Sequence, residues 1–265
     1  MERIQIDEFV NFQFLSNLQL SPNGKKAAFV VSKSNEERDG YSAGIWVLDL
    51  QKKSYRRLTA GKDERSYLWS DDDTILFASR RESKKEEVDR YSTDYFEISL
   101  CGGEAEKKMT IAAPVQQIKK ISDDLYLLNV EYDNNLPADF FEKTGEERRE
   151  VLKSREEEKD YEVFDELPFW RNGEGITNKK RSRLYLYHRK EQKLEPLTGP
   201  MYQLESYDLS EDGSKLLYSG SNFVGVENLK QELTEMDLQT GETNVLVALG
   251  SWNIHRVCYA GEKIL

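Results

Sequence analysis

Residues Gly40-Tyr41-Ser42-Ala43-Gly44 match G-x-S-x-G, the pattern around the nucleophilic serine of α/β-hydrolases. That chemistry requires a buried strand that ends at the serine and a helix that begins after it, so that the serine oxygen is exposed beside an oxyanion hole. Here a charged stretch, 35–39, precedes the motif, and the strand pattern Ile45 to Leu50 follows it. We therefore interpret residues 40–44 as a small polar loop between two strands and expect no catalytic role for Ser42.

Other residue types that could do chemistry are few. A Ser-His-Asp triad could use His188, at the end of an alternating strand pattern, or His255, in a run that resembles an inner strand. Both are interpreted as structural. Cys101 and Cys258 show no metal-ligand spacing with them, and Cys101 begins a turn that no helix follows. The sequence therefore predicts no catalytic, cofactor-binding or metal-binding residue, and the chain alone is expected to be inactive.

The elements around these residues repeat. Ser21, Ser70, Ser122 and Ser210 each follow an apolar strand pattern, begin a polar turn and precede a short apolar run. They lie 49, 52 and 88 residues apart, so two intervals are one repeat long and the third contains an insertion. An internal repeat of about 50 residues indicates a propeller or another repeat architecture.

Each repeat reads as four strands. In the first, these are Phe14 to Leu20, Ala27 to Val31, Ile45 to Leu50 and Tyr55 to Thr59, with a hairpin turn at Asn23-Gly24. Radially arranged four-stranded sheets are the blades of a β-propeller, so we predict an all-β propeller of about four blades. Trp252 to Tyr259, the turn Ala260-Gly261 and Lys263 to Leu265 are read as the start of a fifth blade.

The insertion is expected within blade three, over 134–182. Its first half, Pro137 to Lys159, is rich in charge and reads as one or two surface helices, with Thr144 and Glu147 spaced as a capping box. Its second half, 164–175, is aromatic and rich in turn residues. We expect this half to pack against the propeller or something beside it, with a binding loop as the alternative.

Composition limits the choice of partners and compartment. The net charge is −11, with acidic residues spread along the chain, which argues against nucleic acid or an anionic membrane as the main partner. Two cysteines are too few for a disulfide scaffold, and neither a signal peptide nor a membrane span is evident. We expect a cytoplasmic protein.

The assembled residues resemble the N-terminal propeller of the prolyl oligopeptidase family of serine peptidases, in its acylaminoacyl-peptidase branch. The resemblance covers 1–265. It rests on the opening Ile6-Asp7-Glu8-Phe9 with the turn Ser21-Pro22-Asn23-Gly24, on the strand ends Arg57-Leu58-Thr59 and Pro196-Leu197-Thr198-Gly199, and on Trp170-Arg171-Asn172-Gly173-Glu174-Gly175 followed by Ser182-Arg183-Leu184-Tyr185-Leu186.

This resemblance implies a usually seven-bladed propeller that caps an α/β-hydrolase domain carrying the catalytic Ser, Asp and His. The present chain has no such domain, so no catalytic residue is transferred to it. The chain is then expected to be part of a larger peptidase, to gate the entry of short peptides and to have the hydrolase domain as its partner. The alternative is a stand-alone TolB-like interaction propeller. An open ring leaves strand edges exposed, so we expect the chain either to self-associate or to shield these surfaces by repacking its ends.

Overall fold

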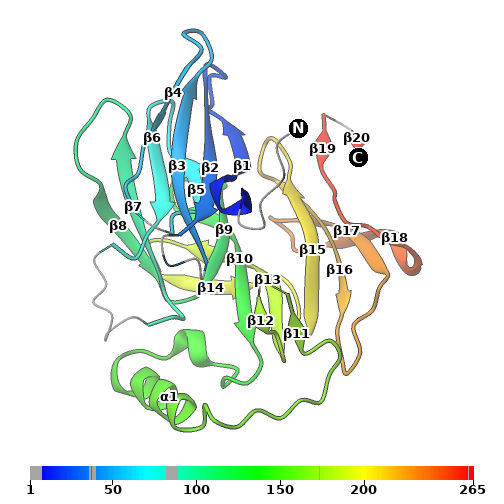
Figure 1. Ribbon diagram of the computed structural model, residues 1–265. Helices are drawn as coiled ribbons and strands as arrows, with labels where there is room; N and C mark the ends of the chain where they lie inside the picture. The colour runs from blue at the N-terminus through cyan, green and yellow to red at the C-terminus, as the bar shows by residue number, and fades with distance from the viewer. Residues whose placement is uncertain are drawn as a thin grey trace, which may run out of the picture. The chain divides into compact units, whose positions relative to one another are not determined.

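The computed structural model describes residues 8–35, 37, 40–61, 63–81, 89–172, 174–261 and 263–265. Ile6, Asp7 and Gly173, which carry part of the family resemblance, lie outside the described residues. The chain forms two compact units, Met1–Lys120 and Ile121–Leu265, and each is described by itself (Figure 1).

The first unit contains two antiparallel sheets. A 3-10 helix, η1 (Glu8–Asn11), precedes a sheet with the order β1-β2-β3-β4, which comprises β1 (Gln13–Leu20), β2 (Lys26–Ser34), β3 (Tyr41–Asp49) and β4 (Ser54–Arg57). The second sheet has the order β5-β6-β7-β8 and comprises β5 (Tyr67–Trp69), β6 (Thr74–Ala78), β7 (Thr93–Ser99) and β8 (Glu106–Ile111). Strand β9 (Val115–Lys120) ends this unit.

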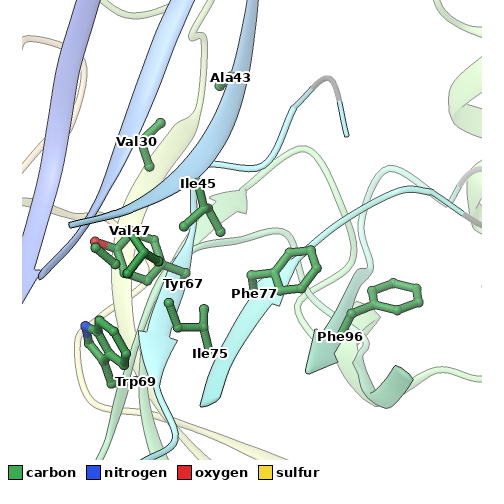
Figure 2. Close-up of a cluster of buried hydrophobic side chains, with 10 residues drawn as sticks. Val30, Ala43, Ile45, Val47, Tyr67, Trp69, Ile75, Phe77 and Phe96 are labelled. Atoms are coloured by element: carbon green, nitrogen blue, oxygen red, sulfur yellow. The ribbon is translucent and has the colours of Figure 1, made fainter. Parts of the chain in front are cut away.

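The two sheets of the first unit share one apolar core. Ala28, Val30, Ile45 and Val47 of the first sheet are buried together with Tyr67, Trp69, Ile75, Phe77 and Phe96 of the second. Figure 2 shows these side chains between the two sheets. Alternate residues of β2 and β3 point to this core, because successive side chains of a strand face opposite sides of its sheet.

The second unit contains one complete four-stranded sheet, with the order β15-β16-β17-β18, and three neighbouring strands in the order β14-β13-β10. Its strands are β10 (Leu125–Asp133), β11 (Trp170–Arg171), β12 (Gly175–Ile176), β13 (Lys180–His188), β14 (Lys193–Pro196), β15 (Tyr202–Leu209), β16 (Lys215–Asn222), β17 (Gln231–Asp237), β18 (Thr243–Trp252), β19 (Tyr259–Ala260) and β20 (Lys263–Ile264). Its helices are η2 (Phe140–Glu142) and α1 (Gly145–Glu157).

The sheets of the second unit also pack face to face. Leu127, Leu184 and Leu186 of β10 and β13 are buried with Tyr202, Leu204, Leu216, Tyr218 and Met236 of the β15–β18 sheet. Gly220 in β16 makes close approach to β15 possible, because a Cβ there would lie 2.3 Å from the backbone oxygen of Gln203. Any larger residue at this position would push the two strands apart.

The first and the last of the four serine turns, one in each unit, have the same structure. In the first turn the Ser21 hydroxyl bonds to the Asn23 side chain at 3.0 Å and accepts the backbone N–H of Lys26 at 3.0 Å. In the last, the Ser210 hydroxyl bonds to Asp212 at 2.7 Å and accepts the backbone N–H of Lys215 at 2.9 Å. The glycine of each turn has a left-handed backbone, with φ of 66° at Gly24 and 71° at Gly213.

The two threonines that follow the last strands of their sheets, Thr59 and Thr198, make the same kind of hydrogen bond. Thr59 is buried and its hydroxyl accepts the backbone N–H of Ile45 at 3.0 Å. The Thr198 hydroxyl accepts the N–H of Leu184 in β13 at 3.2 Å in the same way. In each case the threonine extends the bonding of the sheet past the end of its last strand.

The fold is all-β with repeated four-stranded antiparallel sheets of the propeller type, which confirms the predicted fold class. The strands of the first repeat lie where the sequence places them, although β2 and β3 are longer than expected. Their ladder runs from Lys26 paired with Asp49 to Ser34 paired with Tyr41. The strand pairing therefore includes 41–44, which lie within the expected loop.

The interpretation of Trp252 to Tyr259 as one strand is wrong. Trp252 ends β18, and residues 253–258 have no regular strand structure. Their N–H groups bond instead to side chains of the neighbouring sheet: Ile254 to Gln231 at 2.8 Å, and Val257 to Ser206 at 3.0 Å. The turn at Gly261 and a short strand from Lys263 are present, as β19 pairs with β20.

The segment between β10 and β13 is 134–179, because Arg181 and Ser182 already pair within β13. The predicted helix is present as α1, and Thr144 is its N-cap, but the Thr144 side chain makes no capping hydrogen bond. The helix is charged, but not all of its charged side chains face solvent. Arg148 is buried and its guanidinium lies 4.3 Å from the centre of the Phe140 ring.

Candidate functional site

Ser42 does not occupy a nucleophile elbow. It lies inside β3, paired with Lys33 of β2, and β3 continues to Asp49 with no helix after the serine. The expectation of a loop at 40–44 is therefore wrong, because 41–44 belong to β3. The strand continues past Ser42, so the interpretation that this motif is not a nucleophile elbow is correct. Gly44 has a packing role, since a Cβ there would lie 3.1 Å from the Arg57 guanidinium.

The two histidines contact carboxylates on the surface of the second unit. His188 Nε2 lies 3.2 Å from Glu195, and His255 Nδ1 lies 3.1 Å from Glu205. Cys101 is an exposed free thiol and Cys258 a half-buried one. Within the described ranges, no group of three or more His, Cys, Asp or Glu side chains could hold a metal ion.

The first unit contains a buried charged cluster that the sequence analysis missed. Glu64 is 1% exposed, and its Oε1 accepts the Ser79 hydroxyl at 2.9 Å and the Arg81 guanidinium at 2.7 Å. Its Oε2 accepts the backbone N–H of Gly61 at 3.0 Å. The Arg81 guanidinium also lies 4.9 Å from the centre of the Phe77 ring. Because both carboxylate oxygens are occupied, this cluster clamps the loop between the first and second sheets.

A second buried pair fixes the aromatic half of the insertion. Arg181 in β13 holds Glu166 through two contacts, 2.5 Å and 3.1 Å, and both side chains are almost completely buried. Arg181 also donates to the backbone oxygen of Phe223 at 2.9 Å, and its guanidinium lies 3.9 Å from the Phe223 ring centre. The backbone N–H of Lys179 donates to Glu166 as well. The pair therefore connects the insertion, β13 and the end of β16.

We call the described residues 161–172 and 174–178 the strap. Besides Glu166, it is fastened at Asn178, whose backbone oxygen accepts the Asn135 amide at 3.4 Å. Within the strap, the Asn178 amide donates to the backbone oxygen of Val163 at 2.8 Å. The strap is fastened again at Leu167, whose N–H donates to Gly225 at 2.7 Å and whose carbonyl accepts the N–H of Glu227 at 2.9 Å. Figure 1 shows the chain running from α1 through this segment to β11 and β12. The backbone of the strap is thus held at several separate points.

The side chains of the strap nevertheless include many that face solvent. We call seven of the exposed apolar side chains of the strap and of the loop after β16 the platform: Phe164, Leu167, Phe169, Trp170, Ile176, Val224 and Val226. Their exposed fractions run from 38% at Phe169 to 70% at Val224. The rings of Phe164 and Phe169 are 4.4 Å apart, Trp170 pairs with Ile176, and Leu167 bridges to Val226.

Large exposed apolar side chains on a backbone that is held in place are candidates for contact with another molecule or with another part of a longer polypeptide. The expected packing of the aromatic segment against the propeller holds for Glu166 and the backbone, and not for Leu167 or Trp170.

The sequence contains an indication of the buried arginines. Arg181 and Arg183 share one strand face with Tyr185, where arginine is unusual unless it has a partner.

The start of the insertion has its own aromatic anchor. Phe141 contacts Tyr132 of β10 and Tyr185 of β13, with ring centres 5.8 Å and 6.0 Å apart. Arg183 lies beneath them, 4.4 Å from the Tyr132 ring, and donates to the backbone oxygen of Thr198. Burial lowers the pKa of Arg183 and raises that of Tyr185. This cluster packs the start of the insertion against β10 and β13.

No protein-family model matches the chain. A curated relative, the "Uncharacterized peptidase YuxL" of Bacillus subtilis, is 26% identical over 221 residues, which covers 82% of this chain and 31% of YuxL. Among solved structures, the acylaminoacyl peptidase of Pyrococcus horikoshii matches with a TM-score of 0.55 and 14% identity over 91% of this chain and 33% of that one. TolB from Acinetobacter baumannii matches with a TM-score of 0.51 and 15% identity, over 91% of this chain and 45% of that one.

The chain is therefore similar in sequence to a curated peptidase, and it shares the fold of part of an acylaminoacyl peptidase and of a TolB protein. These findings confirm the resemblance to a peptidase-associated propeller that the sequence indicates. The chain spans about a third of the length of the curated peptidase. No helix in the described part of the chain is long and apolar enough to cross a membrane.

Proposed function

We propose that this chain is the non-catalytic propeller portion of a serine peptidase of the acylaminoacyl-peptidase or dipeptidyl-peptidase kind, acting on short peptides. The observation that carries the proposal is the match to a peptidase along 82% of this chain and only 31% of that protein. The placement of Ser42 inside a strand agrees with it, since the G-x-S-x-G motif here cannot form an elbow. The catalytic Ser, Asp and His then belong to a hydrolase domain, which is the proposed partner.

In this role the chain restricts access. A rigid β-sheet assembly beside a buried catalytic site admits short or flexible peptides and excludes folded proteins, and its walls help to orient the peptide end. The pair of buried Glu64 with Arg81 and the fully buried pair Glu166–Arg181 contribute rigidity, because each closes a loop onto a sheet.

The first test uses the 265-residue chain with chromogenic acyl-peptides and a fluorophosphonate probe. We expect no turnover and no labelling of Ser42, because a strand serine has neither a base nor an oxyanion hole next to it. A Ser42→Ala variant is the matched control. Hydrolysis or labelling that this variant abolishes would overturn the non-catalytic role.

The second test uses the full polypeptide that the gene encodes. We expect the probe to label a serine outside 1–265, and the turnover of acyl-peptides to fall steeply as the peptide lengthens. Equal turnover of short peptides and of an unfolded protein would refute gating. No labelled serine in the full polypeptide would refute the peptidase proposal itself.

The alternative is a stand-alone interaction propeller like TolB, favoured by the TolB match and by the exposed platform. It is distinguished from the first proposal by a coding sequence that stops after Leu265. In that case the chain would act through protein binding alone.

A further inference from the structure

The chain leaves the two sheets of the first unit through the same kind of hydrogen bond. Two residues after the last strand of each sheet, a backbone oxygen accepts a donor from a side chain of that sheet. After β4, Arg57 Nε donates to the oxygen of Thr59 at 2.6 Å. After β8, the Thr93 hydroxyl donates to the oxygen of Ala113 at 2.8 Å. We call this contact the exit bond.

The second unit repeats the exit bond at the same distance along the chain. Arg183 Nε in β13 donates to the backbone oxygen of Thr198, two residues after β14, at 3.1 Å. The Ser219 hydroxyl in β16 lies 3.3 Å from the backbone oxygen of Ile254, two residues after β18, and 3.5 Å from that of Ser206. The shorter contact is the exit bond, so each unit has an exit bond from a guanidinium and another from a hydroxyl.

The residues that carry these oxygens lie past the last strand and are largely buried. Thr59, Ala113 and Thr198 are all buried. A buried backbone oxygen without a partner costs free energy comparable to a lost hydrogen bond. The exit bond therefore satisfies a group that lies beyond the strand pairing.

Two exit-bond side chains also hold the chain further on. Arg57 Nη2 donates to the backbone oxygen of Gly61 at 2.9 Å, and the Gly61 N–H donates in turn to buried Glu64. The Thr93 hydroxyl accepts the N–H of Val115, the first residue of β9, at 2.9 Å. These side chains therefore fix the path from the end of one sheet to the segment that follows it.

The two guanidinium groups come from different but facing positions. Gly44 in β3 and Arg183 in β13 are equivalent, because each precedes the residue whose N–H a threonine accepts. Arg57 and Pro196 are equivalent as the paired last residues of β4 and β14. In the first sheet the Arg57 guanidinium lies over Gly44, where a Cβ would be 3.1 Å from it. In the other sheet Arg183 takes that position, and Pro196 has no side-chain donor.

We propose that the exit bond fixes the direction in which the chain leaves each sheet, and that a guanidinium can supply it from either facing position, that of Arg183 or that of Arg57. The contacts that carry this proposal lie within each unit, so it does not depend on which surfaces are free. It is also independent of the proposed peptidase role.

The first test replaces Arg183 with methionine, which keeps a long side chain but cannot donate. Loss of a hydrogen bond from a charged donor should speed the hydrogen exchange of 197–202 by about 10-fold or more, relative to the amides of β16. Mass spectrometry of the purified chain after exchange measures it. Arg189→Met, at an exposed arginine just after β13, is the matched control and should leave this ratio unchanged. An unchanged ratio in Arg183→Met would overturn the proposal.

The second test moves the guanidinium. Arg183→Gly combined with Pro196→Arg reproduces the arrangement of Gly44 and Arg57. This double variant should exchange 197–202 as slowly as the wild type, whereas Arg183→Gly alone should exchange it at least about 10-fold faster. Equally fast exchange in both variants would overturn the interchange of positions. If circular dichroism shows either variant unfolded, the mirror exchange in the first unit, Gly44→Arg with Arg57→Pro against Arg57→Pro alone, decides the point over 58–61.

The exit bond from a hydroxyl is tested at Thr93. Thr93→Val removes the donor to Ala113 and the acceptor for Val115, so the Val115 amide should exchange about 10-fold faster or more, as measured by NMR. Thr93→Ser keeps the hydroxyl and should retain slow exchange. Thr110→Val removes an exposed hydroxyl from β8 and is the control. No acceleration in Thr93→Val, or equal acceleration in Thr93→Ser, would contradict the role of the exit bond.

Discussion

Replacing Arg181 with methionine tests whether the buried pair holds the strap. The exchange keeps much of the side-chain volume, but it removes both contacts to Glu166, the bond to the backbone oxygen of Phe223 and the stacking on the Phe223 ring. The Glu166 carboxylate then stays buried with the backbone N–H of Lys179 as its remaining partner in the cluster. An uncompensated buried charge is the main source of the expected loss.

Breaking a buried ion pair by removing one partner costs about 3 to 5 kcal/mol. That is a large share of a total stability of about 5 to 15 kcal/mol. With a urea dependence of about 3 kcal/mol per molar, the unfolding midpoint of the variant should fall by about 1 to 1.7 M. Urea titrations followed by circular dichroism and tryptophan fluorescence measure it.

Two further variants separate charge from packing. Glu166→Leu combined with Arg181→Met leaves no buried charge, so it should be less destabilised than Arg181→Met alone. A residual loss of about 1 to 3 kcal/mol is expected from the orphaned Lys179 N–H and Phe223 carbonyl. Lys190→Met removes the exposed pair with Asp124 and should cost under about 1 kcal/mol. If Arg181→Met is no less stable than this control, the strap is not held by the pair and the reasoning fails.

Three other substitutions test local features. Thr198→Val removes the acceptor of the Leu184 N–H and should lower the free energy of unfolding by about 1 to 3 kcal/mol, whereas the exposed Thr243→Val should change it by less than about 0.5 kcal/mol. Phe140→Ala should cost about 3 to 5 kcal/mol, because this ring is 2% exposed, and Arg149→Ala on the open side of α1 provides the control. The backbone N–H of Ser214, with the Ser210 and Ser214 hydroxyls, lowers the pKa of Asp212 to about 2. This carboxylate therefore stabilises the fold above about pH 4, and that contribution is lost as the pH falls toward about 2. Asp212→Asn, which reproduces the residue at position 23 of the first turn, should make stability less dependent on pH in this window, and an unchanged acid titration of unfolding would contradict the assignment.

The Ser210 turn could be predicted because the hydrogen bonds that shape it are local. Ser210, Asp212, Gly213 and Lys215 lie within six residues, and their types determine the turn without help from the rest of the fold. The strands on either side contain short apolar runs, such as Ala27 to Val31 in β2 and Ile45 to Leu48 in β3, so their assignment follows from the same short range. This is why the repeat and the propeller class were evident from the chain alone.

The misassigned elements depend on distant partners. Residues 253–258 carry an apolar pattern like that of a strand, but Gln231 and Ser206, more than 20 residues away, take up two of their N–H groups. Ser42 lies in β3 because β2 extends far enough to pair with it. The residues of these two segments do not themselves reveal the outcome. A short stretch of this kind is compatible with a loop or with the end of a strand ladder.

The sequence by itself determined the repeat, the strand periodicity, the helical insertion and the lack of an elbow at Ser42, because each depends on residues that are near one another along the chain. The tertiary structure decided which charges are buried and which aromatic side chains remain uncovered. In a chain where 33% of residues are charged, nothing local distinguishes Glu166 from its neighbours. Its burial follows from the placement of Arg181 and Phe223 around it, and the exposure of Trp170 follows from the strap being fastened by those same contacts.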